Sequence, residues 1–548
     1  MKRIYLVLIA TIAITFVSCS DQEIDTVKPD AGQVAPIIDL PEGATQGRIL
    51  VKFKPEAASF LDAATTRSVG AALTRSGISD MDAVLQRIGT SKLERIFPVD
   101  NRTEERTRKA GLNLWYIIHF DKDTDLEQVA KDLSQVADVA KVQFTRAIQR
   151  SYDPNVRATV LTKQAMTRVV HTTRAVNTDA NDPFFNLQWG CKNDGSILQN
   201  GEKNDKGDNV VPAVMGVDVN CGEAWKLCTG NPSIVVAVLD EGVMYDHPDL
   251  EGNIWVNEDE TFASKEDADG NGYAGDRYGY NFTDDKGYIS YDDPNDTGHG
   301  THVAGIISAV RNNGEGISGI AGGDKANNRG GVKIMSCQVF SGSKGCDLYQ
   351  EAKAVKYAAD NGAVILQCSW GYNSGLSNPI SGYTPGFTSD KDWVDAAPLE
   401  KEAFDYFLHN AGSPNDVIDG GIIVFAAGNE YAAMAGYPGA YPDYISVAAL
   451  AADGTPSCYS NYAMGVSIAA PGGDSDYHQS SKGKIYSTLP PSANEDGGEN
   501  SHYGYMEGTS QACPHISGVA ALGLSYAAEL HRHFRAEDFR DLVYKSVS

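Results

Sequence analysis

The chain has 548 residues, of which 42% are hydrophobic, and its formal net charge is -26 at pH 7. This length and composition provide for a large core and predict two to four domains. The negative charge excludes nucleic acid as an expected partner, because a phosphate backbone would be repelled. The acidic excess instead favours solubility or the binding of cations.

The N-terminus has the pattern of an export signal. Lys2 and Arg3 precede an uncharged run over residues 4–17. The run is too short for a permanent membrane span but suits the apolar region of a signal peptide. Residues 1–18 are therefore predicted to be a signal peptide, and the mature protein is expected to be exported.

A cysteine directly follows this run. The tetrapeptide Phe16-Val17-Ser18-Cys19 resembles a bacterial lipoprotein box, in which the cysteine is lipidated and becomes the new N-terminus. The acidic residues at positions 21, 23 and 25 resemble those of surface-displayed lipoproteins of the Bacteroidetes type. The resemblance implies lipidation of Cys19, a membrane anchor and an outer-membrane protein exposed at the cell surface. The alternative is a plain signal peptide cut near Ser20.

Besides Cys19, the chain has eight cysteines in a part predicted to reach an oxidising space, where disulfides can form. Their spacing contains no Cys-x-x-Cys pair and no Cys/His cluster typical of zinc, so no structural zinc site is expected. Cys337 and Cys368 lie in apolar, strand-like runs, which favours buried free thiols.

The first half of the chain divides into a tether, a small domain and a linker. Residues 19–45 are polar and lack apolar periodicity, which predicts a tether after the lipidated cysteine. Residues 46–150 alternate between strand-like and helical runs, which predicts a small α+β sandwich. Residues 151–182 are rich in Arg and Thr without periodicity and are predicted to be an exposed activation linker. The expected strands of the small domain cover residues 49–54, 112–120 and 139–144, and its expected helices cover residues 81–88 and 126–136.

The largest part, residues 183–548, alternates nearly continuous apolar strands with helical runs. This pattern predicts an α/β fold with a parallel sheet sandwiched by helices. Functional residues of such sheets lie at the carboxyl ends of strands.

Four residues of this part are candidates for catalysis. Asp240 ends the apolar run of residues 234–239, where a carboxylate is placed to orient a histidine. His299 opens the string His-Gly-Thr-His-Val-Ala-Gly, whose small residues allow a helix to begin close to a cleft. Ser510 follows Gly-Thr at a predicted helix start, with Pro514 in the first turn, and the N–H groups of a helix start suit a developing oxyanion. Asn429 ends the string Ala-Ala-Gly-Asn after another apolar strand.

These strings, in the order Asp, His, Ser, resemble the subtilisin-like serine peptidases, or subtilases, over about residues 183–548. The resemblance implies a catalytic triad of Asp240, His299 and Ser510, with Asn429 as an amide of the oxyanion hole. This chain has Glu241 where the family usually has Ser or Thr.

The same resemblance implies that residues 46–150 are an inhibitory propeptide. In the family, such propeptides end in an extended segment that lies in the active-site cleft, and residues 145–150 are expected to be that segment. The propeptide would then be the intramolecular inhibitor of its own enzyme.

The resemblance also implies two edges between which a peptide pairs as an added strand. One edge is Ser369, Trp370 and Gly371, and the other contains Ser341 and Gly342. Gly428 and Gly436 are expected beside the pocket for the residue before the cleaved bond. That pocket is predicted to accept a large apolar residue, with Trp370 and Glu430 narrowing or charging it.

An acidic loop at residues 267–276 suggests a structural calcium ion. Its string Asp-Ala-Asp-Gly-Asn-Gly offers alternating oxygen ligands around a glycine turn, as in many subtilases, although the bidentate glutamate of an EF-hand is absent. A second site is expected at Asp249 with Asn312 or Asn313, and the alternative is a solvated acidic loop. The expected ligands of the first site are Asp267, Asp269, Asn271 and Asp276.

The sequence thus predicts a secreted serine endopeptidase that hydrolyses peptide or protein substrates through an acyl-enzyme. It is expected to be a monomer and to be made as an autoinhibited precursor. Two alternatives stay open: a catalytically silent binding protein on the same fold, and an enzyme that cuts only its own propeptide.

Overall fold

The computed structural model describes most of the chain beyond the predicted tether. The predicted signal peptide, Cys19 and the middle of the predicted linker lie outside the described residues. No helix within the described part combines the length and the apolarity needed to cross a bilayer. The described residues are 34–39, 43–67, 72–150, 152–153, 155–161, 179–204, 206–412, 416–491 and 502–547.

The N-terminal part contains a five-stranded sheet with the order β1-β5-β2-β4-β3, in which β1 is parallel to β5 and the other pairs are antiparallel. The expected strands and helices are confirmed, except that Leu112–Leu114 form a 3-10 turn before β4. The strands are β1 (Ile37–Ile38), β2 (Arg48–Phe53), β3 (Lys92–Arg95), β4 (Trp115–His119) and β5 (Val139–Gln143). The helices are α1 (Ala58–Arg67), α2 (Ser79–Arg87), α3 (Glu104–Lys109) and α4 (Leu126–Ser134).

The two faces of this sheet are both apolar. Side chains alternate along β2, so Ile49 and Val51 point to the core formed with α2 and α4. Leu50 on β2 and Trp115 on β4 point to the other face and join the core of the large part. The N-terminal sheet is therefore covered by its own helices on one face and by the large part on the other.

The large part is built on an eight-stranded sheet with the order β11-β10-β6-β12-β14-β15-β16, and β7 also pairs with β10. The pairs are parallel except for β10 and β11, which confirms the expected α/β class. The strands are β6 (Val235–Glu241), β7 (Gly279–Asn281), β10 (Lys333–Ser341), β11 (Lys344–Gly345), β12 (Ala363–Cys368), β14 (Ile422–Ala426), β15 (Ile445–Leu450) and β16 (Ile468–Pro471).

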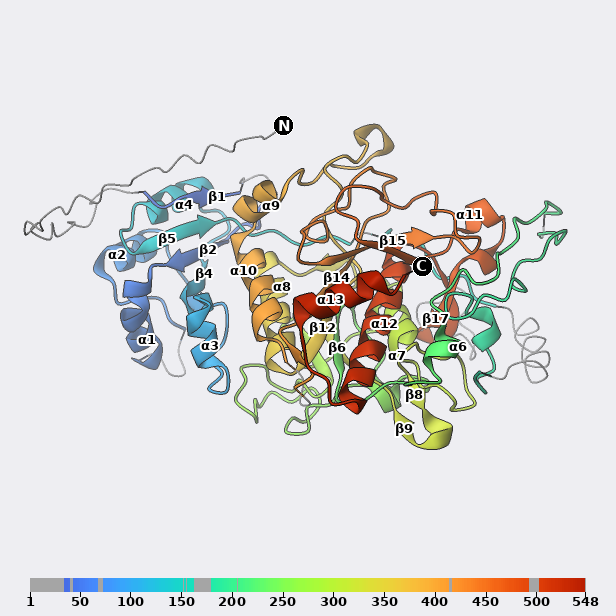
Figure 1. The fold of residues 1–548 in the computed structure, drawn as a ribbon. Helices are drawn as coiled ribbons and strands as arrows, with labels where there is room; N and C mark the ends of the chain where they lie inside the picture. The colour runs from blue at the N-terminus through green and yellow to red at the C-terminus, as the bar shows by residue number, and fades with distance from the viewer. Residues whose placement is uncertain are drawn as a thin grey trace, which may run out of the picture.

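Helices cover both faces of this sheet (Figure 1). On β6, Val236 and Val238 pack into the core shared with α7 (His299–Ser308) and α12 (Thr509–Glu529). Ala237 and Leu239 face the opposite core, which is shared with α8 (Leu348–Asp360) and α10 (Pro398–Asn410). The strand is buried on both sides, which explains its continuous apolar sequence.

The N-terminal part lies against α8 and α10, as Figure 1 shows at the left of the large sheet. The Lys52 ammonium and the Trp115 indole N–H both lie 2.7 Å from Glu402 Oε2 on α10. Arg106 lies 2.9 Å from Asp360 at the end of α8. One face of the N-terminal sheet thus packs on α8 and α10 through apolar contacts, and charged side chains interact beside these contacts.

The fold also places a polar stretch at 372–420 and the cysteines that the sequence predicts to be free thiols. The polar stretch at 372–420 contains α9 (Asp390–Ala396) and α10, and α10 packs beside α8 in the helical layer. Cys337 and Cys368 are buried free thiols, as expected, and none of the cysteines in the described residues forms a disulfide. The remaining elements of the described chain are α6 (Cys221–Ala224), β8 (Gly323–Asp324), β9 (Arg329–Gly330), β13 (Ile418–Asp419), α11 (Ser475–His478), β17 (Ile485–Thr488), β18 (Tyr503–Met506), β19 (Phe534–Arg535) and α13 (Ala536–Lys545).

Candidate active site

Three of the candidate residues lie where separate elements of the large part meet. Asp240 lies near the carboxyl end of β6, His299 begins α7, and Ser510 lies in the first turn of α12. Their exposed fractions are 1%, 3% and 1%. Because α7 and α12 cover the same face of β6, the topology brings together residues that are far apart in the sequence.

Asp240 and His299 form a buried pair. The His299 Nδ1 atom lies 2.8 Å from Oδ1 and 2.9 Å from Oδ2 of Asp240. Since a carboxylate only accepts hydrogen bonds, Nδ1 carries the proton and donates it. Gly300 permits the approach of α7 to β6, because a Cβ at this position would lie 2.1 Å from the Glu241 carbonyl oxygen. The pair fixes the imidazole and leaves Nε2 as its proton-accepting atom.

Ser510 is held by Ser369 on the neighbouring strand end. The Ser510 hydroxyl donates to the Ser369 carbonyl oxygen at 3.1 Å, and the Ser369 hydroxyl donates to the Ser510 carbonyl oxygen at 2.7 Å. Pro514 lies in the second turn of α12, not in the first as the sequence suggested. A proline has no N–H for the carbonyl four residues earlier, so the Ser369 hydroxyl supplies the donor that Ser510 lacks.

Ser510 and His299 are not hydrogen-bonded to each other in this arrangement. The His299 Nε2 atom is buried and has no hydrogen-bond partner among the described groups. The Tyr152 ring stacks on the imidazole, with centroids 3.8 Å apart and planes 14° apart. The Tyr152 hydroxyl donates to Glu241 Oε1 at 3.0 Å. Burial, followed by the nearby Glu241 and Asp240 carboxylates, raises the pKa of Tyr152 well above its usual value, so the hydroxyl stays protonated.

Asn429 follows β14 and faces the start of α12. Its Oδ1 atom accepts from the Thr509 backbone N–H at 2.9 Å and from the Thr509 hydroxyl at 3.0 Å. The amide is thereby oriented with its oxygen toward α12. Gly428, at a φ of 106°, makes the turn that presents Asn429.

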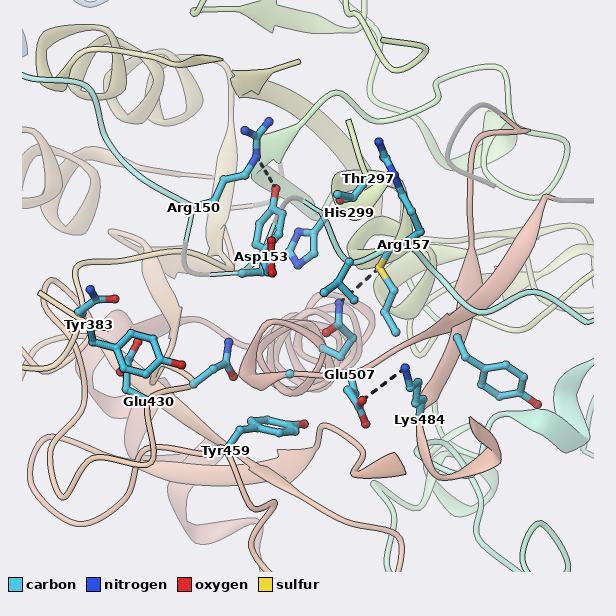
Figure 2. Close-up of a pocket in the computed structure, with 18 of the residues that line it drawn as sticks. Arg150, Asp153, Arg157, Thr297, His299, Tyr383, Glu430, Tyr459, Lys484 and Glu507 are labelled. Atoms are coloured by element: carbon cyan, nitrogen blue, oxygen red, sulfur yellow. Dashed lines mark hydrogen bonds and ion pairs between the residues drawn. The ribbon is translucent and has the colours of Figure 1, made fainter. Parts of the chain in front are cut away.

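His299 and Asn429 border one cleft of about 510 Å³, whose lining also includes Glu430 and Gln511. In the view of Figure 2, His299 lies between Arg150 and Arg157, and Glu430 and Glu507 lie below it. Both arginines come from the segment that links the N-terminal part to the large part.

We call residues 147–159 the cleft segment; the structure describes it except for residues 151 and 154. Ala147 pairs antiparallel with Asp347, and the Ile148 N–H donates to the Cys346 carbonyl oxygen at 2.8 Å. Thr159 pairs with Tyr505 at the far end. The chain therefore runs through the cleft, past the end at Arg150 that the sequence suggested.

The predicted substrate-binding edges occupy different surroundings. Gly342 contacts the cleft segment, since its carbonyl oxygen accepts from Arg150 Nη2 at 2.7 Å. The antiparallel pairing, however, uses Cys346 and Asp347, which the sequence reasoning missed, while Ser341 is the last residue of β10. Which residues pair with the cleft segment depends on where a loop turns, and no local pattern in the sequence predicts the position of that turn.

On the other edge, Ser369 contacts Ser510 and Gly371 follows it toward Tyr437, whose carbonyl oxygen would lie 3.0 Å from a Cβ at Gly371. Trp370 does not narrow a pocket, because it is 2% exposed and packs against Phe425 with centroids 5.6 Å apart. The alternation of side chains along the strand end sends it into the core beneath the cleft.

Gly436 and Glu430 border the region next to Asn429. The Gly436 N–H donates to the Ala427 carbonyl oxygen at 2.9 Å, and a Cβ at this position would lie 2.1 Å from the Tyr372 carbonyl oxygen. Burial raises the pKa of Glu430, whose carboxylate accepts from the Asn461 side-chain amide. Glu430 is thus a buried acid at the wall of the cleft.

The acidic loop at 267–276 folds around a carboxylate cluster. Oxygen atoms of Glu260, Asp267 and Asp269 lie within 4.8 Å of one another. Asp276 is fully buried and accepts from the Tyr357 hydroxyl at 2.7 Å and from Asn271 Nδ2 at 2.9 Å. Glu260 was missed by the sequence reasoning because it lies outside the motif and reaches the loop only through the fold. The three clustered carboxylates form the donor set that suits a hard cation such as Ca²⁺.

Asp249 lies apart from this cluster. Its Oδ1 accepts from Asn313 Nδ2 at 2.8 Å and its Oδ2 from the Ile317 N–H at 2.9 Å. Burial raises the pKa of Asp249 well above its usual value. Among the described residues, Asp249 belongs to neither group of three His, Cys, Asp or Glu side chains close enough to share a metal. The donors around it give it a structural part in the loop.

Comparison with known proteins places these features in one family. The model of the Subtilase family matches residues 231–547, and the model of the N-terminal part of that family matches residues 49–195. The N-terminal match extends through the predicted linker, beyond the predicted domain end at residue 150.

Curated relatives share the same region. Halolysin of Haloferax mediterranei is 30% identical over 323 residues, which are 58% of this chain and 47% of halolysin. A thermophilic serine proteinase of a Bacillus species is 26% identical over 302 residues, 55% of this chain and 54% of that protein. Thermitase of Thermoactinomyces vulgaris is 29% identical over 307 residues, 56% of this chain and 79% of thermitase. The chain spans about half the length of the first two.

Among solved structures, the crystal structure of fervidolysin from Fervidobacterium pennivorans, a keratinolytic enzyme related to subtilisin, is similar with a TM-score of 0.50 at 23% identity. The similarity covers 90% of this chain and 56% of fervidolysin. At this identity the similarity concerns the fold, and it extends over the N-terminal part as well as the large sheet.

Proposed function

The chain belongs to the subtilase family, and from this premise we propose that it is an exported serine endopeptidase made as an autoinhibited precursor. The observation that carries the proposal is the buried hydrogen bond between Asp240 and His299 beside the helix start that bears Ser510. The order Asp, His, Ser along the chain is that of subtilisin-like triads.

In the proposed reaction, Ser510 Oγ attacks the carbonyl carbon of a peptide bond while His299 Nε2 takes the hydroxyl proton. Asp240 keeps the imidazole oriented and stabilises its charged form. The Asn429 amide and the Ser510 backbone N–H stabilise the negative oxygen of the tetrahedral intermediate. His299 then returns the proton to the leaving amine, and water releases the acyl group from Ser510 by the same steps.

We assign autoinhibition to the cleft segment. Tyr152 covers His299 while the Ser510 hydroxyl bonds Ser369, and both contacts have to change before Ser510 can transfer its proton to His299. Peptide and protein substrates would enter the same cleft after the segment leaves. The boundaries that we propose are a propeptide over 46–150, a linker over 151–182 and a catalytic domain over 183–548.

Labelling with a fluorophosphonate probe tests the enzyme proposal. After processing, the wild-type protein is expected to be labelled at Ser510 and to cleave peptide libraries, whereas Ser510→Ala loses both. Ser525→Ala is the matched control, because this buried serine lies on the same helix and bonds the Ala521 carbonyl oxygen. A wild-type protein without label would favour a silent binding protein, and labelling without library cleavage would favour an enzyme restricted to its own propeptide.

For the location, we propose an outer-membrane lipoprotein anchored through Cys19, displayed at the cell surface and monomeric. The support is the Phe16-Val17-Ser18-Cys19 string and the acidic residues after it. Metabolic labelling with a fatty-acid probe is expected to mark the wild-type protein and not Cys19→Ala, whereas labelling of neither protein would favour a plain signal peptide.

We also propose a structural Ca²⁺ ion at the acidic loop. Glu260, Asp267 and Asp269 would hold it, and a bound cation would offset the repulsion among their carboxylates. Asn271 and Asp276 would support these ligands through their hydrogen bonds. Calorimetry is expected to show a lower melting temperature after chelation in the wild type and a much smaller change in Asp267→Asn.

A further inference from the structure

Arg150 is buried in an acidic pocket beside His299. Its Nη2 atom lies 3.2 Å from Asp296 Oδ1 and 2.7 Å from the Gly342 carbonyl oxygen, and its Nε atom lies 3.3 Å from Glu241 Oε1. The guanidinium also lies 5.0 Å from the ring centroid of Phe340. The Arg150 side chain is only 8% exposed, although it belongs to a connecting segment.

The two acids of the pocket are held by hydrogen bonds that do not involve the arginine. Glu241 Oε2 accepts from the backbone N–H groups of Thr297 at 2.9 Å and His299 at 3.0 Å. Asp296 Oδ1 accepts from the Gly342 N–H at 2.8 Å. The two side chains are 1% and 2% exposed, so Arg150 faces two fixed, buried carboxylates.

Two buried carboxylates are costly unless a cation lies between them. Burial and the Glu241 carboxylate raise the pKa of Asp296, which reflects this cost. An arginine suits the site better than a neutral residue, because its planar fork reaches both acids and a carbonyl oxygen while its face lies against an aromatic ring.

The cleft segment lies in the cleft as a peptide would. Its Ile148 pairs with Cys346 on one side of Arg150, and its Tyr152 stacks on His299 on the other. In the proposed reaction His299 has to reach the nitrogen of the leaving residue. Since the residue against His299 is Tyr152, the reactive position corresponds to the bond before Tyr152, and Arg150 occupies the second position before it.

We propose that Glu241 and Asp296 form a specificity pocket that selects substrates with arginine at the second position before the cleaved bond. This inference rests on the proposed function and names its substrate class: proteins with exposed arginine in extended segments. Glu241, which stands where the family usually has Ser or Thr, supplies the selectivity and also holds the backbone of His299.

The first test compares two fluorogenic peptides that differ only at this position, one with arginine and one with its neutral isostere citrulline. The processed wild-type enzyme is expected to have a kcat/KM about 10–100-fold higher for the arginine peptide. In Glu241→Gln and Asp296→Asn the ratio is expected to fall to about fivefold or less. The ratio within each variant cancels any shared loss of activity, which matters because Glu241 also bonds the His299 N–H.

Glu430→Gln is the matched control, because Glu430 is another buried acid at the wall of the same cleft. It is expected to keep the wild-type ratio. A wild-type ratio near one, or a Glu241→Gln ratio equal to that of the wild type, would overturn the pocket assignment while leaving the endopeptidase proposal intact.

The second test does not need activity. In a Ser510→Ala precursor, the Ile148 amide is expected to exchange its hydrogen about tenfold faster after Arg150→Gln, because the pocket no longer holds the segment. Arg146→Gln is the control, since Arg146 lies on the same approach and pairs with Asp39 instead. If no peptide is hydrolysed at all, the proposed function fails, and unchanged exchange in Arg150→Gln would independently overturn the pocket.

Discussion

The N-terminal part contacts the large part in two regions, which differ in how deeply their charged side chains are buried. We call the first the flank: Arg48, Lys52, Arg106, Trp115 and Lys141 against acids on or beside α8 and α10. The second is the cleft segment. In the flank, the Lys52 and Glu402 side chains are 18% and 22% exposed, whereas those of Arg150 and Glu241 are 8% and 1% exposed.

We infer from this difference that the flank supplies the affinity of the N-terminal part for the large part, whereas the cleft segment supplies the inhibition. Partly exposed ion pairs each contribute little and weaken with salt, while a buried charge depends strongly on its partner. The flank spreads its contacts over a sheet face, and the cleft segment concentrates its contacts around His299. Cutting the cleft segment therefore need not release the N-terminal part.

The largest expected effect is a loss of catalysis that leaves the contacts of the flank and of the cleft segment unchanged. Asp240→Asn is expected to lower kcat about 10⁴-fold, because an amide can hold the imidazole in the wrong tautomer. The Asn keeps an Oδ1 atom for the Glu241 N–H, which donates to Asp240 at 2.7 Å. Steady-state kinetics on a saturating peptide measures the loss, and a fall of less than tenfold would contradict the proposed role of Asp240.

The second-largest expected effect concerns two buried glutamates on α8 and α10, the helices against which the flank packs. Glu351 on α8 and Glu400 on α10 are both fully buried, and burial raises the pKa of both, that of Glu400 to about 8. The folded protein thus holds protons that the unfolded chain releases above pH 4.5. The contribution of this pair to the free energy of unfolding is therefore highest below that pH. It falls as the pH rises through about 8, by up to about 1.4 kcal/mol per pH unit for each proton.

Glu351→Gln is expected to flatten this pH dependence, because one titrating group is removed from the pair. Urea unfolding between pH 5 and 8, in a Ser510→Ala background that prevents autolysis, measures the slope. Glu402→Gln is the control, since this acid lies on the same helix but is partly exposed. Parallel slopes in the wild type and Glu351→Gln would show that the pair does not titrate in this range.

A smaller effect is expected in the cleft segment. Tyr152→Ala removes the ring stacked on His299 and is expected to speed fluorophosphonate labelling of Ser510 in the uncut precursor about tenfold. Tyr152→Phe keeps the ring and loses the bond to Glu241, so its effect is expected to be about threefold. Equal labelling rates in the wild type and Tyr152→Ala would mean that Tyr152 does not mask the site.

The sequence predicted the fold well where patterns are local. The strand-like run of residues 49–54 and the continuous apolar run before Asp240 predicted a strand of the small domain and a buried parallel strand, and both are present. The short strands β11 and β1 were missed, because two-residue strands carry no pattern of their own. The helix α10 was not predicted, because charged side chains interrupt its apolar residues.

For the candidate site, the motifs predicted residues that the structure places near one another. His299 bonds Asp240, and His299 and Asn429 line one cleft beside the start of α12, which bears Ser510. Their catalytic roles stay predictions. The motifs could not predict Tyr152 over His299, Cys346 as the ladder partner or Glu260 in the acidic cluster, since each depends on a tertiary contact. Glu241 was noticed as a departure from the family, and only the structure shows its partners, which are Arg150, Tyr152 and the backbone of Thr297 and His299.

The smallest expected effect concerns the flank itself. Glu402→Gln removes the charge that faces Lys52 and Lys141 at 2.7 and 3.4 Å. After the cleft segment is cut, the N-terminal part is expected to bind about fivefold more weakly in this variant at low salt, and the difference should shrink at high salt because the charges are exposed to solvent. Size-exclusion chromatography of the cut protein across a salt series measures the bound fraction. Lys131→Gln is the control, because Lys131 pairs with Glu127 within the N-terminal part. A difference that does not depend on salt would mean that the flank holds through its apolar face, with Leu50 and Trp115, and that its charges only surround that contact.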